Sequence, residues 1–87
     1  MSKQKEMTYE PMVYKTRDTE TASLLKSQNR KFTTEKQGQD VVFVFEDKEE
    51  CEAILDLHNN RELIVKSADL FEAIHAIKKI IINLKNK

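Results

Sequence analysis

Glycine, proline and cysteine are scarce in this sequence, and each shortage excludes a class of protein. One glycine and one proline among 87 residues exclude collagen-like repeats, flexible linkers and glycine-rich loops that bind phosphate. A single cysteine, Cys51, excludes a disulfide framework and a cysteine-based zinc site. No apolar run approaches the ~18 residues that cross a bilayer, so no membrane association is expected.

The remaining composition indicates one small folded domain. Apolar residues make up 39% of the chain and charged residues 34%, and 15 bases balance 15 acids. Blocks of β-branched and aromatic residues distinguish it from a disordered polyampholyte. We expect residues 1–11 to form a flexible leader and residues 12–87 to form the domain. The leader has no apolar secretory segment, and with one cysteine this predicts a cytoplasmic protein.

Charge is unevenly distributed along the chain despite the zero total. Residues 46–56 carry six acids and one base, whereas residues 75–87 carry four lysines and no acid. Helix dipoles favour acids where a helix begins and bases where it ends, which is one interpretation. The other is that the two segments form opposed faces for a partner.

The first half of the chain reads as a strand, a helix and a hairpin. Residues 12–16 alternate partly and predict a strand, and a helix is expected over 19–28. Residues 32–35 and 41–45 are β-prone and flank a turn that contains Gly38, the only glycine. This arrangement predicts an antiparallel hairpin with a central second strand.

The second half predicts two helices separated by a short strand. Asp47 and Glu50 have the spacing of a capping box, which opens a helix that extends to about residue 58. Residues 63–65, Leu-Ile-Val, suggest a strand. Ser67 is expected to cap a final helix over 68–83.

This order, β-α-β-β-α-β-α, predicts an α+β fold. Its first six elements match a ferredoxin-like split βαβ sandwich with a four-stranded antiparallel sheet, followed by an extra C-terminal helix. Two helices on one face of the sheet would leave Val42 and Val44 pointing outward on the other. The last helix carries more apolar side chains than packing against a single sheet face requires. We therefore expect it to cover the second face or to join a second copy of the chain. The predicted self-association residues form a heptad-like stripe: Leu70, Ile74, Ile77, Ile81 and Leu84.

Candidate chemistry is sparse. Cys51 lies on the apolar side of its predicted helix, which indicates a buried thiol rather than a nucleophile. His58 and His75 are far apart in sequence and have no neighbours with metal-ligand spacing. We therefore predict no catalytic residues, no metal site, no cofactor and no small-molecule substrate.

Residues 38–47, GQDVVFVFED, resemble the RNP1 strand of RNA-recognition motifs, and the element order agrees. Tyr14 falls where the RNP2 strand of that family presents an aromatic side chain. The two RNP1 positions that stack on bases in that family are Asp40 and Val42 here. The resemblance therefore indicates shared architecture rather than shared RNA binding.

A second resemblance covers roughly residues 13–84 and is carried by four segments. These are Tyr-Lys-Thr-Arg-Asp at 14–18, Ala-x-Leu-Leu at 22–25, Val-Phe-Val-Phe-Glu-Asp at 42–47 and Ile-Lys-Lys at 77–79. The chain resembles a domain-of-unknown-function family of small bacterial and phage proteins. That family carries a glycine after its first helix, where this chain has Asn29 and Arg30. The resemblance implies an accessory protein of a phage or mobile element and supplies no catalytic residues.

Together these features predict a non-enzymatic, macromolecule-binding accessory protein that self-associates, with a dimer favoured. A protein partner is the first hypothesis, because the net charge is zero and apolar surface exceeds one small core. The alternative is a nucleic-acid-binding module. Its candidate contacts are Tyr14, Lys15, Arg17, Arg30, Lys31, Lys78, Lys79 and Lys85.

Overall fold

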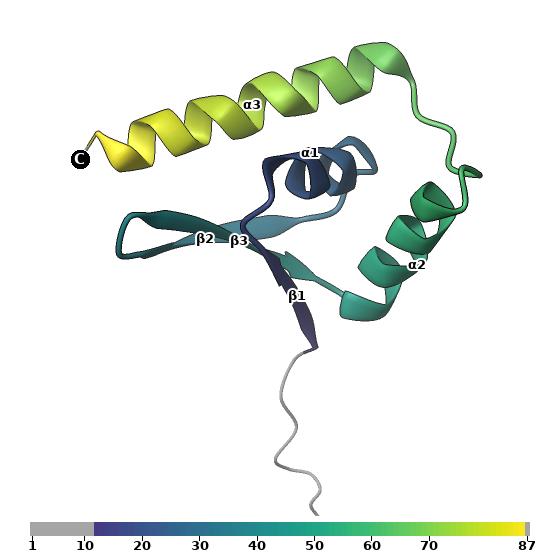
Figure 1. Cartoon of the computed structure of the whole chain (residues 1–87), viewed down its shortest axis with the longest axis horizontal. Coiled ribbons are helices and arrows are strands. Elements are labelled where there is room, and N and C mark those ends of the chain that lie inside the picture. Colours follow the sequence, from purple (N-terminus) through teal and green to yellow (C-terminus); the bar gives the residue numbers. More distant parts are fainter. Residues whose placement is uncertain (1–11, 87) are drawn as a thin grey trace, which may run out of the picture.

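The structure is a computed structural model that describes residues 12–86; the predicted leader, residues 1–11, lies outside the described residues. It has an α+β fold (Figure 1). The elements in order are β1 (Val13–Thr16), α1 (Thr19–Ser27), β2 (Phe32–Gln37), β3 (Asp40–Glu46), α2 (Lys48–Asn59) and α3 (Ser67–Lys85). None of these helices is long and apolar enough to cross a membrane.

The three strands form one antiparallel sheet in the order β1-β3-β2. The predicted hairpin is confirmed, since β2 pairs with β3 from Phe32↔Phe45 to Gln37↔Asp40. Gly38 begins its two-residue turn with φ +62°, a conformation that glycine adopts without a steric cost. The strand of β-branched and aromatic residues is central, as its composition predicts.

The strand predicted over residues 63–65 does not form, so the described residues contain a three-stranded sheet rather than a four-stranded one. α2 ends at Asn59, Arg61 follows with φ +62°, and the chain then runs to α3 without pairing to β1. Ile64 is 90% exposed. A run of three β-prone residues has little strand preference without a packed neighbour.

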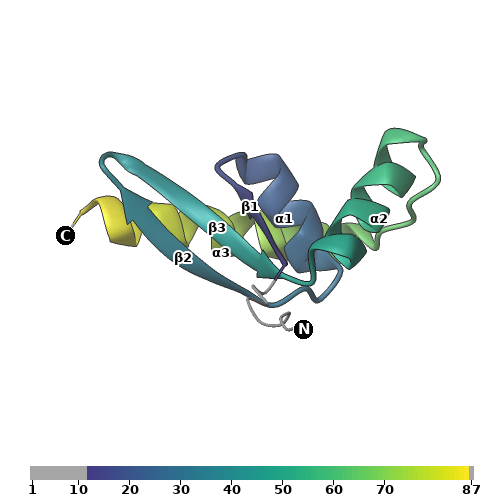
Figure 2. The same cartoon turned by 90° about the horizontal axis from the view of Figure 1, so that it is seen from below.

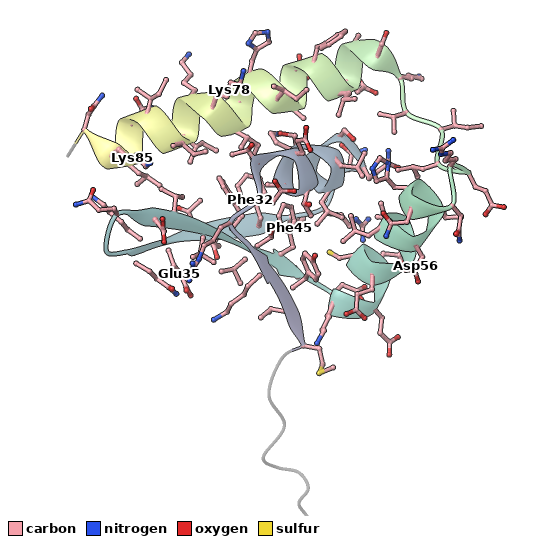
Figure 3. All side chains as sticks on the ribbon, viewed as in Figure 1. Phe32, Glu35, Phe45, Asp56, Lys78 and Lys85 are labelled. Atoms are coloured by element: carbon pink, nitrogen blue, oxygen red, sulfur yellow. The ribbon has the colours of Figure 1, made fainter. Side chains whose placement is uncertain are left out.

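The core lies between one face of the sheet and the helices. Val41, Phe43 and Phe45 of β3 pack against Leu25 of α1 and Ile77 of α3, in a cluster of buried residues. The ring of Phe32 contacts those of Phe43 and Phe45, with centroids 5.8 and 5.1 Å apart. Figure 3 shows Phe32 and Phe45 between the sheet and α1.

The final helix packs on α1, on the core side of the sheet. Figure 2 shows the β2–β3 hairpin in front of α3, so the expectation that this helix covers the second face of the sheet is wrong. Its Leu84 carbonyl accepts a hydrogen bond from Lys36 Nζ at 3.3 Å. Most apolar residues of α3 therefore face α1 and the core, whereas Phe71 and Ile82 stay exposed.

Side chains of the outer strands cover the second face of the sheet. Val42 is 4% exposed and Val44 is half-buried. Lys15, opposite Val44, reaches Glu35, opposite Val42, with Nζ and Oε1 3.8 Å apart. The methylene stems of such long side chains shield apolar surface while their charged ends stay in water. No helix is needed over this face.

Polar side chains fix the starts of two helices. Asp18 caps α1, accepting from the Thr21 backbone N–H at 3.1 Å and from the Thr21 hydroxyl. Asp47 caps α2 as predicted, accepting from the Glu50 N–H at 3.2 Å. The predicted cap at Ser67 is wrong, because α3 begins at that residue and no side chain caps it.

Candidate functional site

A groove of about 780 Å³ opens where α1, α2 and the first half of α3 diverge beside β1. Its apolar lining comes from all four elements: Tyr14, Leu24, Leu55, Leu70 and Ile74. Tyr14 faces the helices because it is opposite Phe45, whose ring belongs to the core. Concave surfaces with apolar walls are the usual place for a ligand or a partner's side chains.

Polar groups from three helices complete the lining of this groove. Glu20 from α1, His58 from α2 and Lys78 from α3 contribute both signs of charge. Asp18 also lines the groove, and the hydrogen bond from the Thr21 hydroxyl lowers the pKa of its carboxyl. That carboxylate is already engaged as the helix cap.

The Ser23 hydroxyl and the Cys51 thiol are engaged or enclosed. Ser23 Oγ donates to the Thr19 carbonyl at 2.7 Å. Cys51 is fully buried, and burial raises the pKa of its thiol. Residues 12–86 contain no group of three or more side chains placed to hold a metal ion. The arrangement can thus bind apolar side chains in an interior with a polar border.

The free edge of β1 borders this groove. Glu46 N–H donates to the Lys31 carbonyl at 3.1 Å, next to the Phe32↔Phe45 pair. Because hydrogen-bonded and non-hydrogen-bonded pairs alternate along an antiparallel ladder, the N–H and C=O groups of Phe45 point away from β2 and toward Tyr14 of β1. The N–H and C=O groups of the alternate residues, Val13 and Lys15, therefore point away from β3, toward the open edge. No backbone hydrogen bond joins them to another part of residues 12–86.

Three of the five residues predicted for self-association pack within their own chain. Ile77 is fully buried, and Ile81 and Leu84 pack against the core. Leu70 and Ile74 are half-buried and line the groove. Self-association through this stripe stays a prediction.

The residues predicted for nucleic-acid binding lie on different surfaces. Lys15 and Arg17 lie on the second face of the sheet, where Arg17 Nη1 is 3.5 Å from Asp40 Oδ2. Lys78, Lys79 and Lys85 are exposed on α3, and Lys78 also lines the groove.

Of the other three candidate contacts, Tyr14 lines the groove together with Lys78. Arg30 is half-buried near Cys51, and Lys31 is exposed just before β2. The eight candidates thus form no continuous surface, and nucleic-acid binding stays a prediction.

Sequence reasoning missed the groove and the β1 edge. Leu24 and Leu55 read as ordinary helix-core residues, and no motif marks Glu20 or His58. The one available signal was the breadth of the apolar face of α1, which includes Leu24 beside Ala22 and Leu25.

No protein-family model matches the chain, and neither does any curated protein or solved structure. The family resemblance described above therefore stays a prediction, and the function has to be argued from the geometry of the chain itself.

Proposed function

We propose that the chain is a non-enzymatic protein-binding module that receives an extended segment of a partner as an added strand on β1. The observation that carries this proposal is the open edge of β1 beside an apolar groove. Unpaired N–H and C=O groups on an exposed edge form a template for another strand. In recognition of this kind, backbone hydrogen bonds give affinity and adjacent pockets give specificity.

The pleat of a strand defines what such a segment would contain. Every second side chain of an added strand would lie on the same side of the sheet as Tyr14 and enter the groove. The alternate side chains would lie beside Lys15 on the second face. The partner segment therefore has apolar residues at every second position and polar residues between them.

An added strand would also occupy the position of the missing fourth strand. In a split βαβ sandwich with the order seen here, that strand lies on the free edge of β1. The four-stranded sheet predicted from the sequence is therefore proposed for the complex with the partner segment.

The expected affinity is modest. Two apolar side chains buried in the groove supply roughly 3–6 kcal/mol, and each backbone hydrogen bond adds about 1 kcal/mol. Association costs at least ~4 kcal/mol in lost freedom of motion. The balance favours a transient interaction, which suits an accessory protein. The resemblance to phage and bacterial proteins suggests that the partner belongs to a phage or its host.

The proposal can be tested with peptides selected from a random library on the full chain. Val13→Pro removes one outward N–H, and a proline is tolerated where the N–H faces solvent. Selected peptides should bind this variant ~10-fold more weakly, the loss of about 1.4 kcal/mol. Amide signals of Val13 and Lys15 should shift on binding in NMR spectra.

Thr34→Pro provides the matched control. The same ladder geometry points the N–H of Thr34 away from β3, at the free edge of β2, and no residue of β2 lines the groove. Circular dichroism should show both variants folded. Failure to select any peptide, or peptides that bind wild type and Val13→Pro equally, would refute the proposal.

A further inference from the structure

An exposed isoleucine on α3 stands at the centre of a basic surface. Ile82 is 57% exposed, on the side of α3 opposite the buried Ile77. Lys78 and Lys79 precede it by four and three residues, Lys85 follows it by three, and all three lysines are exposed. These spacings place side chains around one point of a helix surface. We define the basic patch as Lys78, Lys79, Ile82 and Lys85.

An acidic surface on α2 repeats this spacing with the opposite charge. Ala53 is exposed, on the side of α2 away from the buried Cys51 and Ile54. Acids stand four and three residues before it and three residues after it, and all are exposed. We define the acidic patch as Glu49, Glu50, Ala53 and Asp56. Figure 3 shows Asp56 pointing away from the body of the molecule.

The two patches are complementary in charge and in spacing. Each has three exposed charged side chains, positive on α3 and negative on α2, around one exposed apolar side chain, Ile82 or Ala53. The ion pairs among residues 12–86, Lys15–Glu35 and Arg17–Asp40, use neither patch.

The two patches of one chain cannot meet. α3 crosses above α1, whereas α2 follows the C-terminal end of β3. The outer faces of α2 and α3 point in different directions (Figures 1 and 2). A surface with the required spacing and charge is therefore available only on another molecule.

We propose that this molecule is a second copy of the chain, whose acidic patch on α2 docks on the basic patch on α3. The contact joins two different surfaces. If each of two molecules docks its acidic patch on the other's basic patch, a dimer closes; if each molecule docks on the next one, a larger assembly forms. Six exposed charges dominate it, and such interactions weaken as salt shortens their range. The contact lies on exposed faces of α2 and α3. Lys78 also lines the groove, but the four residues exchanged in the test below do not.

Charge exchange tests the proposal, with self-association measured by light scattering and sedimentation. Wild type should associate at low salt and dissociate as salt increases. Lys79→Glu/Lys85→Glu makes both patches negative, and Glu50→Lys/Asp56→Lys makes both positive. Each double variant should associate on the order of 10-fold more weakly. Mixing the two variants should restore association at low salt, because one supplies an acidic and the other a basic patch.

Lys31→Glu/Lys66→Glu is the matched control, since it changes the net charge equally at exposed lysines outside both patches. It should associate like wild type. Circular dichroism should show that all variants are folded. A wild type that stays monomeric at low salt and millimolar concentration would overturn the proposal. So would a mixture of the two variants that associates no better than either alone. Peptide binding at β1 should be unaffected by these exchanges, which separates this test from that of the proposed function.

Discussion

Replacing Ile77 by alanine should destabilise the domain far more than replacing Ile82 on the same helix. Ile77 is fully buried among Leu25, Phe43 and Phe45, whereas Ile82 is 57% exposed. Three carbon groups at ~0.8 kcal/mol each give about 2.4 kcal/mol for Ile77, and the cavity left behind raises the loss to roughly 3–4 kcal/mol. A chain of this size is stable by only about 4–13 kcal/mol.

Ile82→Ala should change the free energy of unfolding by no more than about 0.5 kcal/mol, because its side chain fills no cavity. Urea titration followed by circular dichroism measures both values. High salt during the titration suppresses charge-dependent association. In thermal unfolding, Ile77→Ala should lower Tm by roughly 12–30 °C. The packing of α3 on α1 described here would be refuted if the two substitutions cost the same, or if Ile77→Ala cost less than about 1 kcal/mol.

Two ionisable side chains give further predictions. The hydrogen bond from the Thr21 hydroxyl lowers the pKa of Asp18 below its usual 3.8, so its ionised form adds stability above that pH and loses it as the pH falls through the folded-state pKa. Asp18→Asn should keep most of the cap and reduce this acid dependence in urea titrations between about pH 5 and pH 2; an unchanged dependence would contradict the role of the carboxylate. Burial raises the pKa of the Cys51 thiol above 9.0, so stability should decline as the pH rises beyond that value. A thiol reagent should modify native Cys51 far more slowly than the urea-unfolded chain, and equal rates would show that the thiol is accessible.

Local patterns in the sequence were sufficient for most elements of the fold. The turn at Gly38 between two β-prone runs and the cap at Asp47 describe interactions between residues close in sequence, and the structure confirms both. At residues 63–65 the local pattern predicted a strand that does not form. A strand there would pair with the free edge of β1, but the chain runs from α2 to α3 without reaching that edge, and α3 then docks on α1.

The two faces of the sheet illustrate a second limit. Val42 and Val44 were correctly placed on the face opposite the core, but the sequence does not reveal that Lys15 and Glu35 meet across them, since this depends on the register of three strands. The groove was likewise unpredictable, because its lining comes from one strand and three helices. Its residues are individually ordinary, and only the tertiary arrangement makes them a surface.

The pairing of α1 with α3 has a consequence for how the chain acquires its fold during synthesis. α1 leaves the ribosome early, and the β2–β3 hairpin can close soon after it because its partners are neighbours in sequence. The helix that covers α1 is made last among the described elements. In a nascent chain the face of α1 that packs on α3 therefore stays exposed until α3 has been synthesised. Aggregation during expression should accordingly depend on events at the ribosome as much as on the stability of the finished domain.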